Sequence, residues 1–134
     1  MGFSLMEMLV VVSLIGIMSL VAWPKVITLY NQSQVRSART AVRNLFEAGR
    51  MNARANNTRV TLTRTGNIFQ ITNVTTGAVL GSVNVDGEFK VTASGLSPLN
   101  IDARGLSNPD RTYVFTRGNA SDSVVISGYG RVTR

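Results

Sequence analysis

An apolar run near the start of the chain limits what this sequence can fold into more than any other feature. It extends from Phe3 to Trp23 and contains a single charged residue, Glu7. As a helix that rises about 1.5 Å per residue, this run is about 31 Å long, enough to cross the hydrocarbon core of a bilayer. A carboxylate is costly in that environment, so the presence of Glu7 needs an explanation.

Two roles are open to Glu7. Ser4 and Glu7 have the spacing of a capping box, in which the glutamate accepts a hydrogen bond from the backbone N–H of Ser4. Alternatively, if the chain is cut after Gly2, Phe3 carries a free ammonium, and Glu7 can pair with the ammonium of a neighbouring subunit. The two roles are compatible, because this cut leaves both Ser4 and Glu7 in place.

The sequence Gly-Phe-Ser-Leu-x-Glu (2–7) ahead of an apolar helix resembles the processing site of type IV pilins and type II secretion pseudopilins. In that family a prepilin peptidase cleaves after the glycine and N-methylates the new first residue. The resemblance implies cleavage between Gly2 and Phe3, methylation of Phe3 and a role for Glu7 in filament assembly. Pro24 falls where many pilins have a helix-kinking proline.

The same resemblance predicts an α+β, pilin-like fold: a long N-terminal helix, transmembrane in its first half, packed on a small antiparallel β domain. Residues 1–2 are then a leader; because leaders in this family are longer and basic, we expect the true start to lie upstream. Residues 3–24 form the transmembrane and filament-core helix, residues 25–56 an amphipathic helix, and residues 57–134 the β domain.

The pattern after Pro24 is that of an amphipathic helix ending near Asn56. Apolar and small residues at helical spacing predict a stripe that faces the core: Val35, Ala38, Val42, Leu45, Phe46 and Gly49. Arginines fall largely on another side, which we interpret as a solvated or filament-facing surface: Arg36, Arg39, Arg43, Arg50 and Arg54.

From Arg59 onward the apolar residues alternate with polar ones, which is typical of strands. The pattern predicts six to eight short strands in one antiparallel sheet or two packed sheets. The Asp86-Gly87 pair predicts a type I′ hairpin between residues 83–85 and 88–91. Asp86 and Glu88 alone are too few ligands for a calcium site. A further hairpin is expected from residues 112–117 and 123–127, with a short strand at 99–103.

The β region also resembles the GspH/FimT group of minor pilins and pseudopilins. The residues that support this resemblance are Ile-Asp-Ala-Arg-Gly-Leu (101–106), Thr-Tyr-Val-Phe-Thr-Arg-Gly (112–118) and the Gly-Arg-Val tail (130–132). It implies a minor subunit of a type IV pilus or of a type II secretion pseudopilus. The implied partners are other pilin or pseudopilin subunits, prepilin peptidase and the bacterial inner membrane. The implied location is single-pass in that membrane, with the β domain in the periplasm or in a filament.

The alternative function is a FimT-like DNA receptor at a pilus tip that acts in natural transformation. Lysine and arginine number 14 against 7 acidic residues, a net charge of +7, which suggests polyanionic partners. DNA-binding members of the group have a Gly-Arg-x-Arg motif near the C-terminus. This chain has Gly-Arg-Val-Thr-Arg (130–134), which makes Arg131 and Arg134 candidates for double-stranded DNA, with Arg117 as a helper. Phosphate contacts of this kind carry no base specificity.

An enzyme is not expected. The chain contains no histidine and no cysteine, so the usual nucleophile–base pairs and metal ligands are missing, and no catalytic residue, metal site or cofactor is predicted. The acidic residues of the β region form no recognisable acid–base pair. The glycines fall at predicted hairpin turns and do not form a phosphate-binding loop.

Overall fold

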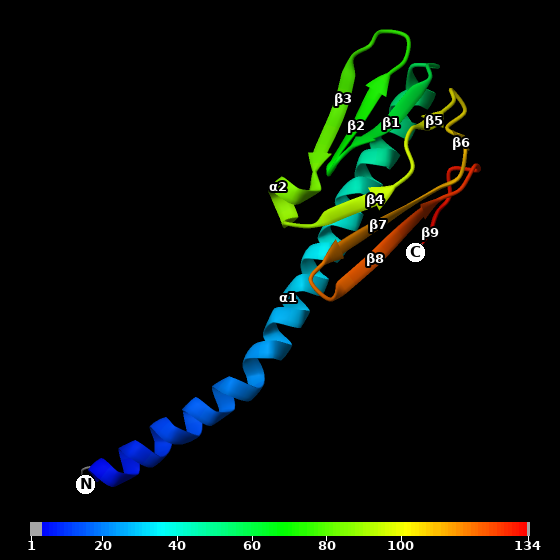
Figure 1. Cartoon of the computed structure of the whole chain (residues 1–134). Coiled ribbons are helices and arrows are strands. Elements are labelled where there is room, and N and C mark those ends of the chain that lie inside the picture. Colours follow the sequence, from blue (N-terminus) through cyan, green and yellow to red (C-terminus); the bar gives the residue numbers. More distant parts are fainter. Residues whose placement is uncertain (1–3, 134) are drawn as a thin grey trace.

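A computed structural model describes residues 4–133 of the chain. Its dominant element is one continuous helix, α1 (Leu5–Ala55), which carries a β domain on its C-terminal half (Figure 1). We call residues 5–30 the protruding half of α1 and residues 31–55 its packed half. The predicted arrangement of a long helix on a small antiparallel β domain is confirmed.

The ends of α1 are set by polar side chains. Ser4 is the N-cap, and its Oγ accepts a hydrogen bond of 3.3 Å from the N–H of Met6. Asn56 is the C-cap, as the sequence predicted. Pro24 lies inside the helix, where its ring removes one backbone hydrogen bond. Figure 1 shows that the protruding half and the packed half of α1 run in different directions.

The buried stripe of the packed half matches the prediction closely. Five of the six expected positions are buried, whereas Leu45 is half-buried and packs at the edge of the core. Ala53 is buried as well and extends the stripe to the last turn. At Gly49 an added Cβ would lie 2.3 Å from Cδ1 of Ile71, so only glycine permits this approach of helix to sheet.

The β domain consists of two antiparallel sheets whose nine strands lie between residues 60 and 133 of the described chain. The first sheet has the order β3 (Val79–Asn84), β2 (Ile68–Asn73), β1 (Val60–Thr65), β5 (Leu99–Ile101) and β6 (Ser107–Asn108). The second has the order β4 (Thr92–Gly95), β7 (Arg111–Arg117), β8 (Ala120–Ile126) and β9 (Val132–Thr133). Two packed sheets were one of the predicted arrangements, but the prediction was six to eight strands and the described chain has nine.

The predicted Asp86-Gly87 hairpin is wrong. Residues 85–89 form a short helix, α2 (Val85–Phe89), because the side chain of Asn84 caps it by accepting a 2.9 Å hydrogen bond from the N–H of Gly87. Lys90 then adopts a left-handed conformation with φ of 55°. This connection leads the chain from β3 in the first sheet to β4 in the second, so these strands are not neighbours.

Aromatic side chains join the two sheets in the core. Phe69 of β2 meets Tyr113 of β7 edge-on, with 5.2 Å between ring centroids, and lies 5.9 Å from Phe115. The Tyr113 hydroxyl is buried and has no hydrogen-bond partner in the described part of the chain. Burial raises the pKa of this hydroxyl above its ordinary value, an effect that the nearby Arg111 and Arg64 partly oppose.

Candidate functional site

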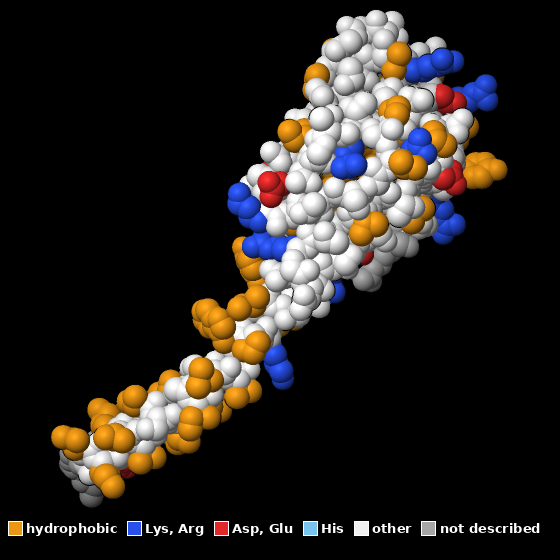
Figure 2. Space-filling view, in the orientation of Figure 1, with side chains coloured by type: hydrophobic (Ala, Val, Ile, Leu, Met, Phe, Trp, Pro, Cys, Tyr) orange, Lys and Arg blue, Asp and Glu red, His pale blue; other side chains and the backbone are white. Residues whose placement is uncertain are grey.

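The protruding half of α1 is largely apolar and extends away from the β domain (Figure 1). Every residue from 4 to 30 is exposed, including Leu5 at 84% and Trp23 at 69%. Figure 2 shows apolar side chains along this half and Lys and Arg side chains mainly over the β domain. By length and composition α1 is compatible with a single-pass membrane anchor.

The predicted processing residues, Gly2 and Phe3, lie outside the described residues, so cleavage and methylation stay predictions. Glu7 is described, and it is exposed on the first turn of α1. Ser4 caps the helix, but Glu7 does not complete the capping box: among residues 4–133 its carboxylate has no hydrogen-bond or ion-pair partner. The carboxylate is therefore free to bind a group from another chain.

Several arginines of the packed half are tied to the β domain instead of facing solvent. Arg39 forms an ion pair of 2.9 Å with Asp122 of β8. Arg50 donates 2.9 Å hydrogen bonds to the carbonyls of Gly105 and Gly130. Our interpretation of the arginine side as a solvated surface therefore fails at these positions.

Two glycines make the Arg50 contacts possible. Gly105 and Gly130 have φ of +79° and +70°, a region that favours glycine. A Cβ at Gly130 would lie 2.8 Å from Cζ of Arg50, and one at Gly105 would lie 2.4 Å from Nε of Arg54. Arg54 in turn donates to the carbonyl of Arg104 at 2.8 Å. We call this arrangement the arginine clamp, because it fastens the loop at 102–106 and the C-terminal tail to α1.

Arg117, the predicted helper in DNA binding, is engaged inside the molecule. Its Nε donates to Oδ1 of Asn31 at 3.1 Å, one terminal nitrogen donates to the carbonyl of Phe89, and its guanidinium lies 4.9 Å from the ring centroid of Tyr30. Arg117 thus fastens the β7–β8 turn to the point where α1 leaves the β domain.

The structure does not bring Arg117 and Arg131 together. Arg117 pairs with Ala120 at one end of the β7–β8 hairpin, whereas the tail at Val132 pairs with Ile126 at the other. Six residues of strand separate these ends, which corresponds to about 20 Å. Arg131 is exposed, and Arg134 lies outside the described residues.

The C-terminal tail lies beside arginines of α1. Arg39 and Arg43 of α1 line a hollow of about 100 Å³ together with Val124, Val132 and Thr133. Arg43 is exposed and has no partner among residues 4–133. This meeting of tail and helix was not predicted, because no local pattern shows which strand packs beside which turn of a helix.

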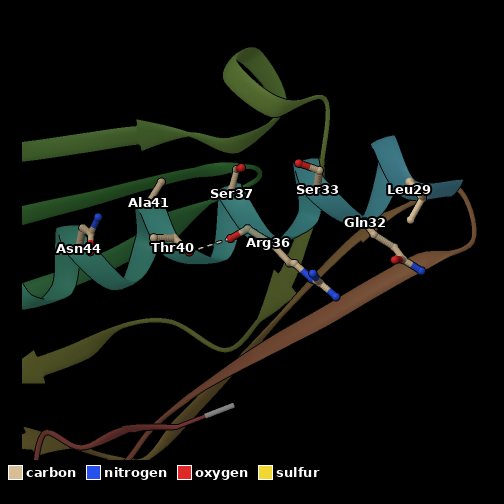
Figure 3. Close-up of a pocket in the computed structure, with 8 residues that line it drawn as sticks. All are labelled: Leu29, Gln32, Ser33, Arg36, Ser37, Thr40, Ala41 and Asn44. Atoms are coloured by element: carbon tan, nitrogen blue, oxygen red, sulfur yellow. Dashed lines mark hydrogen bonds between the residues drawn. The ribbon is translucent and has the colours of Figure 1, made fainter. Parts of the chain in front are cut away.

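A second hollow, of about 490 Å³, follows the face of α1 opposite the buried stripe (Figure 3). It is lined only by residues of this helix: Leu29, Gln32, Ser33, Arg36, Ser37, Thr40, Ala41 and Asn44. Figure 3 shows the Thr40 hydroxyl bonded to the Arg36 carbonyl, at 2.9 Å. Its small side chains, Ser33, Ser37 and Ala41, permit the close approach of another chain at this exposed helix face.

A third hollow, of about 890 Å³, lies where β1, β5 and β6 meet the loop at 127–129. Its carboxylates hold loops in place: Asp102 accepts hydrogen bonds from the N–H groups of Arg104 and Leu106, and Asp110 accepts one from Gly128. Among the described residues there is no group of three or more His, Cys, Asp or Glu side chains that could hold a metal.

No family model and no curated protein matches this chain. Among solved structures it is similar to the type IV minor pilin FimU of Pseudomonas aeruginosa strain PAO1, in two crystal forms. The P21 form matches with a TM-score of 0.62 and 18% identity, over 75% of this chain and 87% of that chain. The P65 form matches with a TM-score of 0.60 and 18% identity, over 73% and 90%. At this identity the similarity shows the fold, so the predicted type IV pilin fold is confirmed.

Proposed function

We propose that this chain is a minor subunit of a type IV pilus or of a type II secretion pseudopilus. The observation that carries the proposal is the fully exposed apolar half of α1 on a β domain with the fold of a type IV minor pilin. In this proposal residues 3–24 lie in the bacterial inner membrane and later in the filament core. The β domain then lies in the periplasm or on the filament surface, and the partners are other pilin-type subunits.

The unpartnered carboxylate of Glu7 supports a role in assembly. It lies on the first turn of the protruding half, where no group among residues 4–133 neutralises it. Prepilin peptidase would cut between Gly2 and Phe3, and the new methylated amine of Phe3 in a neighbouring subunit would supply the opposite charge. In an apolar filament core such a pair is worth far more than in water.

The mature N-terminus tests this proposal. We expect the native protein, purified from membranes, to begin at a methylated Phe3 when its N-terminal peptide is analysed by mass spectrometry. A mature chain that retains Gly2 would contradict processing by prepilin peptidase. A deletion strain then distinguishes the two machines: loss of twitching or transformation indicates a pilus, and loss of exoprotein secretion indicates a pseudopilus.

A second candidate function is the binding of double-stranded DNA at the C-terminal tail. The observation that favours it is the hollow that the tail shares with Arg39 and Arg43 of α1, because the exposed Arg43 and Arg131 add positive charge at this surface. Arg39 is already neutralised by Asp122, so it contributes less. Arg134 stays a candidate from the sequence.

Salt dependence tests the DNA proposal. Each neutralised phosphate contributes about −0.9 to the slope of log affinity against log salt, so Arg131→Ala should make the slope shallower by about one unit. Fluorescence anisotropy with the full chain in neutral detergent micelles measures this at several salt concentrations. Lys90→Asn is the matched control, since it removes one charge at α2 and suits the left-handed φ of 55°. Equal slopes for the wild type, Arg131→Ala and Arg43→Ala would exclude this site.

A further inference from the structure

Three of the four outer sheet edges in the described chain are closed. β6 and β9 are only two residues long, and Pro109 follows β6. The outer edge of β4 is covered by side chains, since Arg64 donates to the carbonyls of Ala93 and Gly95, and Asn67 accepts from the N–H of Ala93. These edges therefore offer little for another strand to pair with.

The fourth edge, β3, is open. β3 has six residues and pairs only with β2, and along its outer side no described group outside α2 bonds to its backbone. The N–H of Val85 donates to the carbonyl of Asn67, so the β2–β3 register turns the backbone N–H and C=O of Ser82 and the N–H of Asn84 outward, whereas the carbonyl of Asn84, the N-cap of α2, accepts the first hydrogen bond of that helix. A second strand can be hydrogen-bonded to Ser82 and to the N–H of Asn84 without breaking any existing contact.

The open edge also lacks the charges that usually protect such strands. Residues 65–85 include no Asp, Glu, Lys or Arg, although the whole chain carries a net charge of +7. Val79 and Leu80 on this edge are 56% and 40% exposed. An uncharged, partly apolar edge without proline is a template for strand addition.

The packing of α1 beside β3 determines which side chains an added strand can have. Gly81 and Val83 pair with the buried Ile71 and Phe69 and so face α1, where Cδ1 of Leu45 lies 3.0 Å from the position of a Cβ at Gly81. Side chains of an added strand on this face would rest next to Leu45 and the small residues one turn from it. Its other face would extend the polar row of Ser82 and Asn84.

We propose that β3 is a docking edge for an extended, uncharged strand of a different protein chain, with small apolar side chains on one face and short polar ones on the other. The β3 strand of a second copy does not fit. β3 runs beside the packed half of α1 (Figure 1), so antiparallel pairing of two β3 edges would point the two anchors in opposite directions. Parallel pairing would place the two helices on opposite faces of the sheet and leave the apolar face of each added strand without its helix.

The test uses the full chain in detergent micelles and a labelled, uncharged peptide that alternates threonine with alanine and valine. We expect saturable binding of the plain peptide. N-methylation along one edge removes the N–H groups that would donate to β3, so the methylated peptide should bind about tenfold more weakly. Ser82→Pro removes an outward N–H and should have the same effect, whereas Ser82→Thr keeps the N–H and should bind like the wild type.

Each result of this experiment either supports or overturns strand docking at β3. If Ser82→Pro fails to fold, as judged by thermal unfolding, the comparison of the two peptides still decides. Equal binding of the plain and N-methylated peptides, or no binding of either, overturns the proposal. Because the chain has no cysteine, Ser82→Cys reports on self-pairing alone, and disulfide-linked dimers well above those of Ser121→Cys, on the interior strand β8, would show that a second copy occupies the edge instead.

Discussion

The two halves of α1 are one helix in two different environments. In the protruding half every described residue is exposed and the only acidic side chain is Glu7, whereas in the packed half one stripe is buried and arginines bind the β domain. The backbone conformation is the same in both. Helix formation therefore does not depend on which surroundings the side chains face. The apolar side chains of the protruding half are left exposed, because no described part of the chain covers them.

The largest effect is expected at Glu7, in the protruding half. Glu7→Ala should leave membrane insertion and the thermal unfolding of the β domain unchanged, because no described group binds the carboxylate. Incorporation into filaments should be nearly lost, because a neighbouring amine would have no counter-charge. Fractionation followed by filament pull-down measures both, with Glu7→Asp as the charge-retaining control. Normal incorporation of Glu7→Ala would contradict the assembly role.

A substitution at Phe46, in the packed half, should have the next largest effect, on the free energy of unfolding. It is fully buried, so Phe46→Ala should lower the free energy of unfolding by about 3–5 kcal/mol. The matched substitution Leu14→Ala, at a position 56% exposed, should change it by less than about 0.5 kcal/mol in micelles. Denaturant unfolding of both full-length variants gives the two values. Equal losses would show that the two halves share one cooperative core.

The arginine clamp should be worth less than the core but remain measurable. Arg50→Ala leaves the carbonyls of Gly105 and Gly130 without their donor and should lower the free energy of unfolding by about 1–3 kcal/mol. Arg43→Ala removes the same charge from an exposed, unpartnered side chain and should stay within about 0.5 kcal/mol. The same unfolding experiment compares them, and a loss at Arg43 as large as at Arg50 would mean that charge, not the clamp, is responsible.

The smallest effect is expected at Tyr113. Tyr113→Phe removes a buried hydroxyl that has no partner in the described chain, so at neutral pH we expect a change within about 1 kcal/mol, neutral or stabilising. Burial raises the pKa of the hydroxyl above 10.0, so the unfolded chain loses the proton first and stability falls as the pH rises past that value. Unfolding curves between neutral and alkaline pH should show a shallower loss for the variant, and parallel curves would contradict the assignment.

Much of the fold could be predicted because its apolar residues recur at the spacing of a helix or of a strand within single elements. The apolar run, the helix end at Asn56 and the buried stripe follow directly from spacing along one helix. The β7–β8 hairpin has a turn between alternating strands and was also predicted. The role of Glu7 in filament assembly stays a prediction.

The errors came from side-chain hydrogen bonds and sheet crossings that the spacing of apolar residues does not show. Asp86-Gly87 has a hairpin signature, but the Asn84 cap and the need to cross between sheets turn it into α2. The partners of Arg50 and Arg117 are backbone carbonyls and an amide far along the chain, and no local pattern predicts them. Arginine content indicated charge, whereas the structure uses several of these side chains as long-range hydrogen-bond donors.

The clamp between Arg50 and Gly130 has a consequence for the order in which the molecule is made. The two residues are 80 positions apart, so this contact closes one of the longest loops in the chain. The β1–β2 hairpin needs only neighbouring residues and can form while synthesis continues. The clamp must wait until the tail has emerged, so pulsed hydrogen exchange should find protection in β1 and β2 before β9. A chain that ended before Gly130 would keep the core between α1 and the sheets and the bonds of Arg50 and Arg54 to the loop at 102–106, but it would lack the bond that fixes the tail to α1.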